Sequence, residues 1–193
     1  MNSKELVIQR FKDSIYVKEQ NIKDEKLVDM ISKIADELAK TIKNGNKLIV
    51  CGNGGSASDA LHFAGEIVGR FQKERAAWSA VSLNADVATL TAIANDYGYN
   101  DVFARQVDGH ARFGDLFIGI STSGNSENVL RAAKVAKKKG ISTAAFLGKD
   151  GGKIKNVVDY PVIVKCDTTA RVQESHTCII HIICELAEEM LAQ

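Results

Sequence analysis

The strongest constraint on the fold is an alternation of apolar runs and helical patterns that starts after residue 46. Five runs are short and apolar enough to be buried strands: 47–51, 78–83, 116–120, 141–147 and 160–164. Helical patterns lie between and after them, near 57–71, 87–94, 126–139 and 170–191. Alternating strands and helices predict a parallel sheet with helices on both faces. We therefore expect an α/β fold, a three-layer αβα sandwich around a parallel, mostly five-stranded sheet.

The N-terminal segment is helical in pattern, with apolar residues at three- and four-residue steps up to Gly45. The last helix is apolar around much of its circumference, so its own sheet would leave part of it uncovered. We expect helices within residues 1–45 to pack in an oligomer, at least a dimer, and residues 46–193 to form the rest of a single structural domain.

Composition excludes several classes of partner. The 25 Lys and Arg residues nearly balance the 24 Asp and Glu residues, which gives no electrostatic reason to expect nucleic acid or an anionic membrane. The longest nearly apolar run, 178–184, is far too short to span a bilayer, and the N-terminus lacks the apolar core of a signal peptide. The four cysteines have no CxxC spacing and are interpreted as reduced core thiols. These features predict a cytoplasmic protein.

Two strand-to-helix junctions carry unusual chemistry. The first is CGNGGSAS at 51–58, and the second is STSGNS at 121–126. Both should lie at the carboxyl edge of the sheet, where open α/β folds bind ligands. Glycines allow a ligand close to the backbone, and the free N–H groups at a helix start attract anions. The second loop adds four hydroxyl groups, which suits a phosphate group.

Each loop also has a simpler interpretation. Ser56 or Ser126 alone would be an ordinary helix N-cap. The first loop formally fits the dinucleotide pattern GxGxxA, but the acidic residue expected after the next strand is absent, because that strand ends Leu83-Asn84. The chain has no GxxxxGK[ST] sequence, so a P-loop is excluded as well.

Acid–base and metal candidates lie on two helices. His62 and Glu66 are four residues apart, one turn along the same helix face, and Gln173 and His181 share a polar band on the last helix. Glu66 and His181 would suffice to move a proton between neighbouring carbons of a sugar. The four side chains could equally supply N and O ligands to zinc, but Gln is an uncommon zinc ligand, so composition alone does not favour a metal site. An exposed His–Glu pair and a core histidine bonded to a carbonyl are the simpler alternatives.

Five ordered blocks give the chain a resemblance to a known family. They are CGNGGS at 51–56, HFAGE at 62–66 with GR at 69–70, NDYG at 95–98, GISTSGNS at 119–126, and RVQE at 171–174 followed by His181. With these blocks the chain resembles the SIS (sugar isomerase) domain family, and within it the bacterial phosphoheptose isomerases. The resemblance implies that residues 46–193 form the SIS domain, with a flavodoxin-like sheet, and that the protein is a homotetramer with active sites between subunits.

The resemblance also implies an activity: isomerisation of sedoheptulose 7-phosphate to D-glycero-D-manno-heptopyranose 7-phosphate through an enediol. This is the first step towards heptose for lipopolysaccharide or other glycoconjugates. In that activity Glu66 would be the base and His181 the acid. Phosphate contacts are implied for Ser121, Thr122, Ser123 and Ser126. Sugar contacts are implied for Asn53, Gly54, Gly55, Ser56, Glu66, Arg70, Asn95, Asp96 and Gln173. Zinc in some members would be bound here by His62, Glu66, Gln173 and His181.

Two departures from the family pattern leave the preferred sugar open. Ala170 stands where some members have an acidic residue, and Leu61 replaces a frequent Gln. The alternative function is a non-catalytic SIS protein, either a phosphosugar sensor or a partner of a replication initiator. The presence of both Glu66 and His181 favours the enzyme.

Overall fold

The sheet of the molecule is parallel and has five strands in the order β2-β1-β3-β4-β5. A computed structural model describes residues 2–191. Its strands are Leu48–Gly52 (β1), Ala80–Ser82 (β2), Leu116–Ser121 (β3), Ser142–Gly148 (β4) and Tyr160–Val164 (β5). The predicted five-stranded parallel sheet is therefore confirmed, with the strand order of flavodoxin-like folds.

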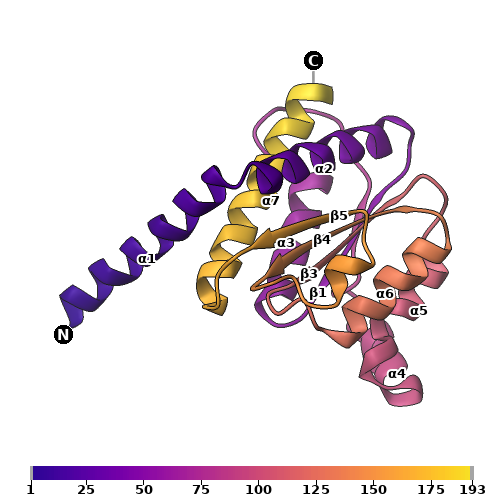
Figure 1. Ribbon diagram of the computed structural model, residues 1–193. Helices are drawn as coiled ribbons and strands as arrows, with labels where there is room; N and C mark the ends of the chain where they lie inside the picture. The colour runs from indigo at the N-terminus through magenta and orange to yellow at the C-terminus, as the bar shows by residue number, and fades with distance from the viewer. Residues whose placement is uncertain (1, 192–193) are drawn as a thin grey trace.

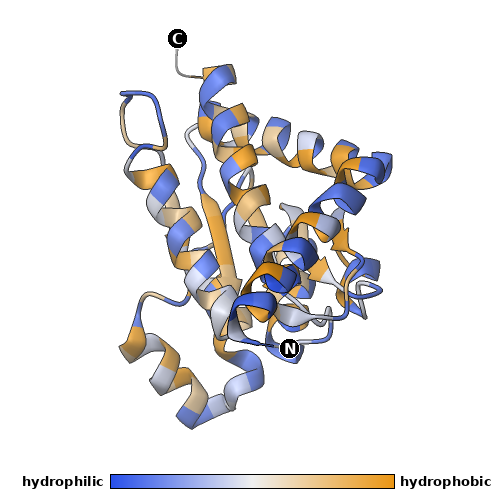
Figure 2. Ribbon diagram, turned by 90° about the vertical axis from the view of Figure 1, so that its left-hand side faces the viewer, coloured by the Kyte–Doolittle hydropathy of each residue, from blue (hydrophilic) through white to orange (hydrophobic). Residues whose placement is uncertain are grey.

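Helices cover both faces of this sheet (Figure 1). They are Ser3–Lys23 (α1), Glu25–Lys43 (α2), Gly55–Val68 (α3), Val87–Tyr97 (α4), Val102–His110 (α5), Glu127–Lys138 (α6) and Thr169–Leu191 (α7), with short 3-10 helices at Tyr99–Asp101 (η1) and Ile154–Asn156 (η2). Residues of α2, α3 and α7 share one hydrophobic core with Leu48 and Val50, whereas α5 and α6 share another with Ile49 and Cys51. Alternate residues of β1 thus face opposite cores, and the strands visible in Figure 2 are predominantly hydrophobic.

Several elements differ from the expected boundaries, and helix α4 runs to Tyr97 where an end near residue 94 was expected. Strand β2 has only three residues, where 78–83 was expected. Helix α3 ends at Val68, short of residue 71, because Gly69 leaves helical geometry (φ −73°, ψ −106°). Helix α5 has nine residues and was not predicted, since its apolar pattern is too short to stand out beside the neighbouring α4.

The N-terminal segment forms two helices separated at Asp24. This residue has non-helical dihedral angles (φ −87°, ψ 87°), and its side chain accepts a hydrogen bond from Leu27 N, which caps α2. Helix α1 extends away from the rest of the molecule (Figure 1), and Val17 is the buried residue that it contributes. Its large apolar side chains are mostly exposed: Leu6, Val7, Ile8, Phe11, Ile15, Tyr16 and Ile22. That these helices pack in an oligomer stays a prediction.

Within residues 2–191, no helix combines the length and the apolar character needed to cross a membrane.

Candidate functional site

The two glycine- and serine-containing loops lie side by side at the carboxyl edge of the sheet. One leads from β1 into α3 and the other from β3 into α6. Strands β1 and β3 are neighbours, with Gly52 paired to Ile120 just before the loops. The strand order reverses between these two strands, and open α/β folds bind ligands at such a point. The predicted position of both loops is confirmed.

The hydroxyl groups of the 121–126 loop converge. Ser121 Oγ lies 2.8 Å from Ser126 Oγ and 3.4 Å from Ser123 Oγ. Ser126 occupies the N-cap position of α6, but within residues 2–191 its side chain makes no capping hydrogen bond. The N-cap interpretation therefore does not account for the Ser126 hydroxyl. Together with the positive end of the α6 dipole, these hydroxyls form a site suited to an anion.

The path of this loop depends on Gly124, whose φ of +67° favours glycine. A Cβ at this position would overlap the carbonyl group of Gly151 and lie 2.7 Å from Gly152 N. The loop after β3 therefore packs directly on the backbone of the loop after β4.

The 52–56 loop is held by side-chain amides. Gly54, not Ser56, is the N-cap of α3, and Ser56 is buried. Asn53 exchanges two hydrogen bonds with Asn128 of α6, 2.9 and 3.0 Å long, and accepts a third from Tyr99 Oη at 3.0 Å. These contacts join the first loop to the start of α6, beside the serine loop.

The first loop is also tied to the end of β2. The side chain of Asn84 donates to Gly52 O at 2.9 Å and accepts from Gly52 N at 3.1 Å. Asn84 stands where a dinucleotide-binding fold has its acidic residue, and here it fixes the backbone of β1. This contact agrees with the rejection of the dinucleotide interpretation.

Helices α3 and α7 bring the acid–base candidates together. His62 Nε2 lies 2.9 Å from His181 Nε2 and 3.4 Å from the Glu66 carboxylate. One ligand atom from each of the three residues lies within 4.8 Å of the others. Two imidazole nitrogens and a carboxylate oxygen are donors that zinc accepts, so the donor set fits this metal. The simple exposed His–Glu pair does not describe this arrangement, because His181 faces the same point from another helix.

Gln173, the fourth predicted ligand, lies near the N-terminal end of α7. Its amide group packs against Gly55 in the first turn of α3, where a Cβ on the glycine would overlap it. This contact places Gln173 beside the first loop, two helical turns from His181.

Other predicted residues lie on more exposed segments. Asn95 and Asp96 are exposed on α4 and bond to each other at 2.8 Å. Arg70 lies in the segment after α3 and pairs with the exposed Glu74 at 3.4 Å. Thr122 is half-buried in the serine loop.

Asp59 is a site residue that sequence reasoning missed. It is 5% exposed on α3, one turn before His62, and accepts a hydrogen bond from Thr177 Oγ1 of α7 at 2.9 Å. Its second oxygen is buried and has no hydrogen-bond partner among the described residues. Burial raises the pKa of this carboxyl group above its ordinary value, against the lowering effect of Thr177. The residue looks like any polar helix residue in the sequence, and only its spacing to His62 was a signal.

His176, in contrast, belongs to the core. It is fully buried, and Nε2 lies 3.1 Å from Leu147 O at the end of β4. Burial lowers its pKa to about 4, so the ring is neutral at physiological pH.

Comparison with known proteins places these features in a family. The model of the SIS domain matches residues 11–148. A phosphoheptose isomerase of Clostridium acetobutylicum is 46% identical over 188 residues, covering 97% of this chain and 96% of that protein. Another, from Campylobacter jejuni, is 49% identical over 181 residues, covering 94% and 90%. The solved phosphoheptose isomerase of Neisseria gonorrhoeae is 40% identical and superposes with a TM-score of 0.91, covering 97% of this chain and all of that one.

Proposed function

The chain belongs to the SIS-domain family and, within it, to the phosphoheptose isomerases, and we propose that it converts sedoheptulose 7-phosphate into D-glycero-D-manno-heptopyranose 7-phosphate. The names of its relatives support the heptose substrate. The observation that carries the proposal is the convergence of Glu66 and His181 from two helices. A phosphosugar sensor would need the serine loop but not this pair, so we favour the enzyme over the non-catalytic alternative.

We assign the phosphate to the serine loop. Ser121, Ser123 and Ser126 offer converging hydroxyls, and Thr122 lies between them. The backbone N–H groups at the start of α6 supply further donors. Asn53, Gly54, Gly55 and Ser56, with Arg70, Asn95, Asp96 and Gln173, would line the sugar.

Glu66 is assigned as the base and His181 as the acid. Glu66 removes a proton from C1 of the ketose while His181 protonates the oxygen on C2, which gives the enediol. His181 then takes the proton from the oxygen on C1, and Glu66 returns its proton to C2, which gives the aldose. The sum is the transfer of hydrogen between two carbons, with no change in composition.

Zinc is the cofactor that this site suits. His62, Glu66 and His181 would hold it. Gln173 is the proposed fourth ligand, and its amide would have to leave its contact with Gly55 to reach the metal. When bound, zinc polarises oxygen atoms of the substrate. A histidine that binds zinc through Nε2 has no proton on that atom to donate, so the zinc content and the role of His181 must be measured together.

We also propose that the active protein is a homotetramer with active sites between subunits. Helix α1 exposes an apolar surface that another copy would cover, and residues 1–45 would serve this packing. Gly55 and Glu66 are about 16 Å apart along the axis of α3, so in one subunit they do not contact the same reacting carbon. Residues from a second subunit would close this distance.

The function is tested by incubating the protein with sedoheptulose 7-phosphate and detecting the aldose by NMR. Glu66→Gln should lose turnover and keep substrate binding, measured by calorimetry, because the amide cannot take the proton. The matched control is Glu189→Gln, a change of an exposed helical carboxylate. Turnover in Glu66→Gln would disprove the assigned base, and no conversion by the unchanged protein would disprove the substrate.

A further inference from the structure

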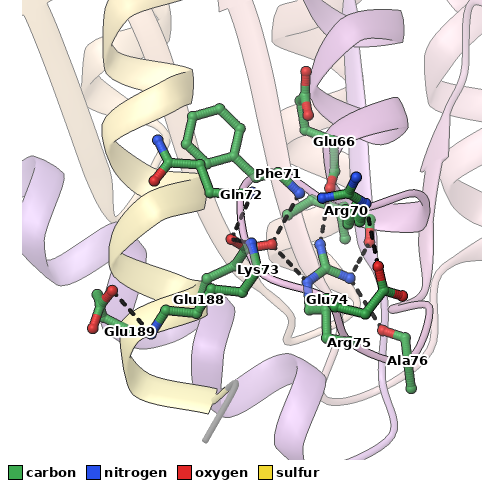
Figure 3. A network of polar contacts seen from close by, with 11 residues as sticks. Glu66, Arg70, Phe71, Gln72, Lys73, Glu74, Arg75, Ala76, Glu188 and Glu189 are labelled. Carbon is green, nitrogen blue, oxygen red and sulfur yellow. Dashed lines mark hydrogen bonds and ion pairs between the residues drawn. The ribbon is translucent and has the colours of Figure 1, made fainter.

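A segment without regular structure, residues 69–79, connects α3 to β2 and is anchored by one buried carboxylate. Glu188 of α7 is 2% exposed and accepts hydrogen bonds from Phe71 N, Gln72 N and Lys73 N at 2.8–2.9 Å (Figure 3). Three successive backbone N–H groups form a concave anion site, which is filled here by the protein's own side chain.

Arg75 of the same segment completes the anchor. Its Nε donates to Glu188 at 2.9 Å, and its two terminal nitrogens donate to Glu66 O at 2.9 Å and Ile67 O at 3.1 Å (Figure 3). The guanidinium group lies 3.6 Å from the centre of the Trp78 ring. Arg75 thus caps the carbonyl groups at the end of α3, which a cation stabilises through the helix dipole.

The pair joins the two helices that carry the acid–base residues. One of the carbonyls that Arg75 binds belongs to Glu66 itself. Glu188 lies two turns after His181 on α7. Phe71, whose N–H is held by Glu188, places its ring 5.5 Å from the ring of His181.

A contribution to stability does not by itself explain why the protein buries this ion pair. Burying two charges costs desolvation energy, and well-packed apolar residues often replace a buried ion pair without loss. The Glu188 and Arg75 side chains are 2% and 4% exposed. Their hydrogen bonds fix directions and distances, which apolar contacts do less well.

We propose that Arg75 and Glu188 are positioning residues that set the separation of Glu66 on α3 from His181 on α7. This inference rests on the roles proposed above for Glu66 and His181. The pair is buried and would act through the end of α3 and through Phe71.

Glu188→Gln tests the inference because it keeps the shape of the side chain and removes its charge. An amide cannot accept from three N–H groups and Arg75 as a carboxylate does. A displacement near 1 Å in an active site costs up to about 100-fold, so we expect kcat to fall about tenfold or more, with KM changed less than about threefold. The matched control is Glu189→Gln, which removes the neighbouring exposed ion pair to Lys73 across the same two segments (2.9 Å) and should leave both constants unchanged.

Arg75→Lys is the second variant. Lysine keeps a positive charge near Glu188 but lacks the planar fork that reaches Glu66 O and Ile67 O. We expect the same selective fall in kcat. If Glu188→Gln does not fold, Arg75→Lys decides the question at a temperature where circular dichroism shows it folded. A folded variant of either kind with unchanged kcat, even if its melting temperature is lower, would overturn the inference.

A measurement that needs no turnover separates this inference from the proposed function. The Phe71 ring, 5.5 Å from the His181 ring, should shift the NMR resonances of the His181 ring protons, which are assigned with His181→Gln. These resonances should move in Glu188→Gln and stay in place in Glu189→Gln; unmoved resonances in Glu188→Gln would count against positioning. In the activity assay, turnover by Glu66→Gln would disprove the role of Glu66 as the base. If Glu66→Gln is inactive and Glu188→Gln is fully active, only the positioning role of Glu188 is disproved.

Discussion

Replacing Gly124 by alanine tests whether the serine loop needs its close packing on the loop after β4. Gly124 has φ +67°, and Gly140, just after α6, has φ +70°. An alanine with such a positive φ costs about 1–2 kcal/mol of stability at either position. The surroundings differ: a Cβ on Gly140 meets no atom within 4 Å, whereas one on Gly124 overlaps Gly151 and lies 2.7 Å from Gly152 N. Gly140→Ala is therefore a control for the backbone cost alone.

The overlap of the added Cβ decides how much more stability Gly124→Ala loses than Gly140→Ala. A Cβ contact below 3.0 Å forces a shift, and the atoms that would have to move are backbone atoms. Overpacking of this kind costs about 1–3 kcal/mol. We expect Gly140→Ala to lower the free energy of unfolding by about 1–2 kcal/mol and Gly124→Ala by about 2–5 kcal/mol.

The assay is urea unfolding at one fixed subunit concentration, because association contributes to the stability of an oligomer. Relief of the overlap should also displace Ser123, next to Gly124, so KM for the phosphosugar should rise at least about tenfold in Gly124→Ala and stay unchanged in Gly140→Ala. Equal stability and equal KM in the two variants would refute the reasoning about the loop.

Three further predictions concern the core, the metal and the assembly. His176 has a folded pKa of about 4 against an ordinary 6.5. Its neutral form therefore contributes fully to the free energy of unfolding above pH 6.5, and this contribution, up to about 3 kcal/mol, is lost as the pH falls towards 4. Urea unfolding at pH 7.5 and 5.0 should show this loss, and His176→Gln, which can keep the bond to Leu147 O, should show less of it. His62→Ala should lower the zinc content of the purified protein, measured by mass spectrometry, whereas His110→Ala on α5 should not; equal zinc in both would remove His62 from the site. Phe11→Asp on α1 should dissociate the proposed homotetramer in light scattering, because it puts a charge on the exposed apolar surface that another copy would cover; an unchanged mass would show that α1 lies outside the interface.

The fold was largely predictable because buried parallel strands have a simple signal. Both faces of β1 and β3 are covered, so each strand is a continuous apolar run in the sequence. The signal fails where structure depends on contacts with distant residues. Helix α3 stops at Val68, and the segment that follows is held by Glu188, more than a hundred residues later. The sequence pattern near residue 70 contains no trace of that contact.

The candidate site was predictable only in part, for a similar reason. His62 and Glu66 were recognisable because one helical turn separates them, and the serine loop because four hydroxyls are unusual in six residues. Asn128 and Asp59 look like ordinary polar helix residues. Their importance comes from partners on other elements, Asn53 for the first and Thr177 for the second. Such pairings depend on tertiary structure and have no local pattern.

The phosphate site proposed for the serine loop and the proposed acid–base pair depend on different parts of this fold. The serine loop follows from a strand-to-helix junction at the point where the strand order reverses, a position that binds ligands in many α/β proteins. Glu66 and His181 instead depend on how α3 packs against α7, which the strand order does not fix. A small shift between the two helices would leave the serine loop intact and separate the pair. The contacts between α3 and α7, including Asp59 with Thr177, are therefore where an isomerase and a phosphosugar sensor built on the same sheet should differ.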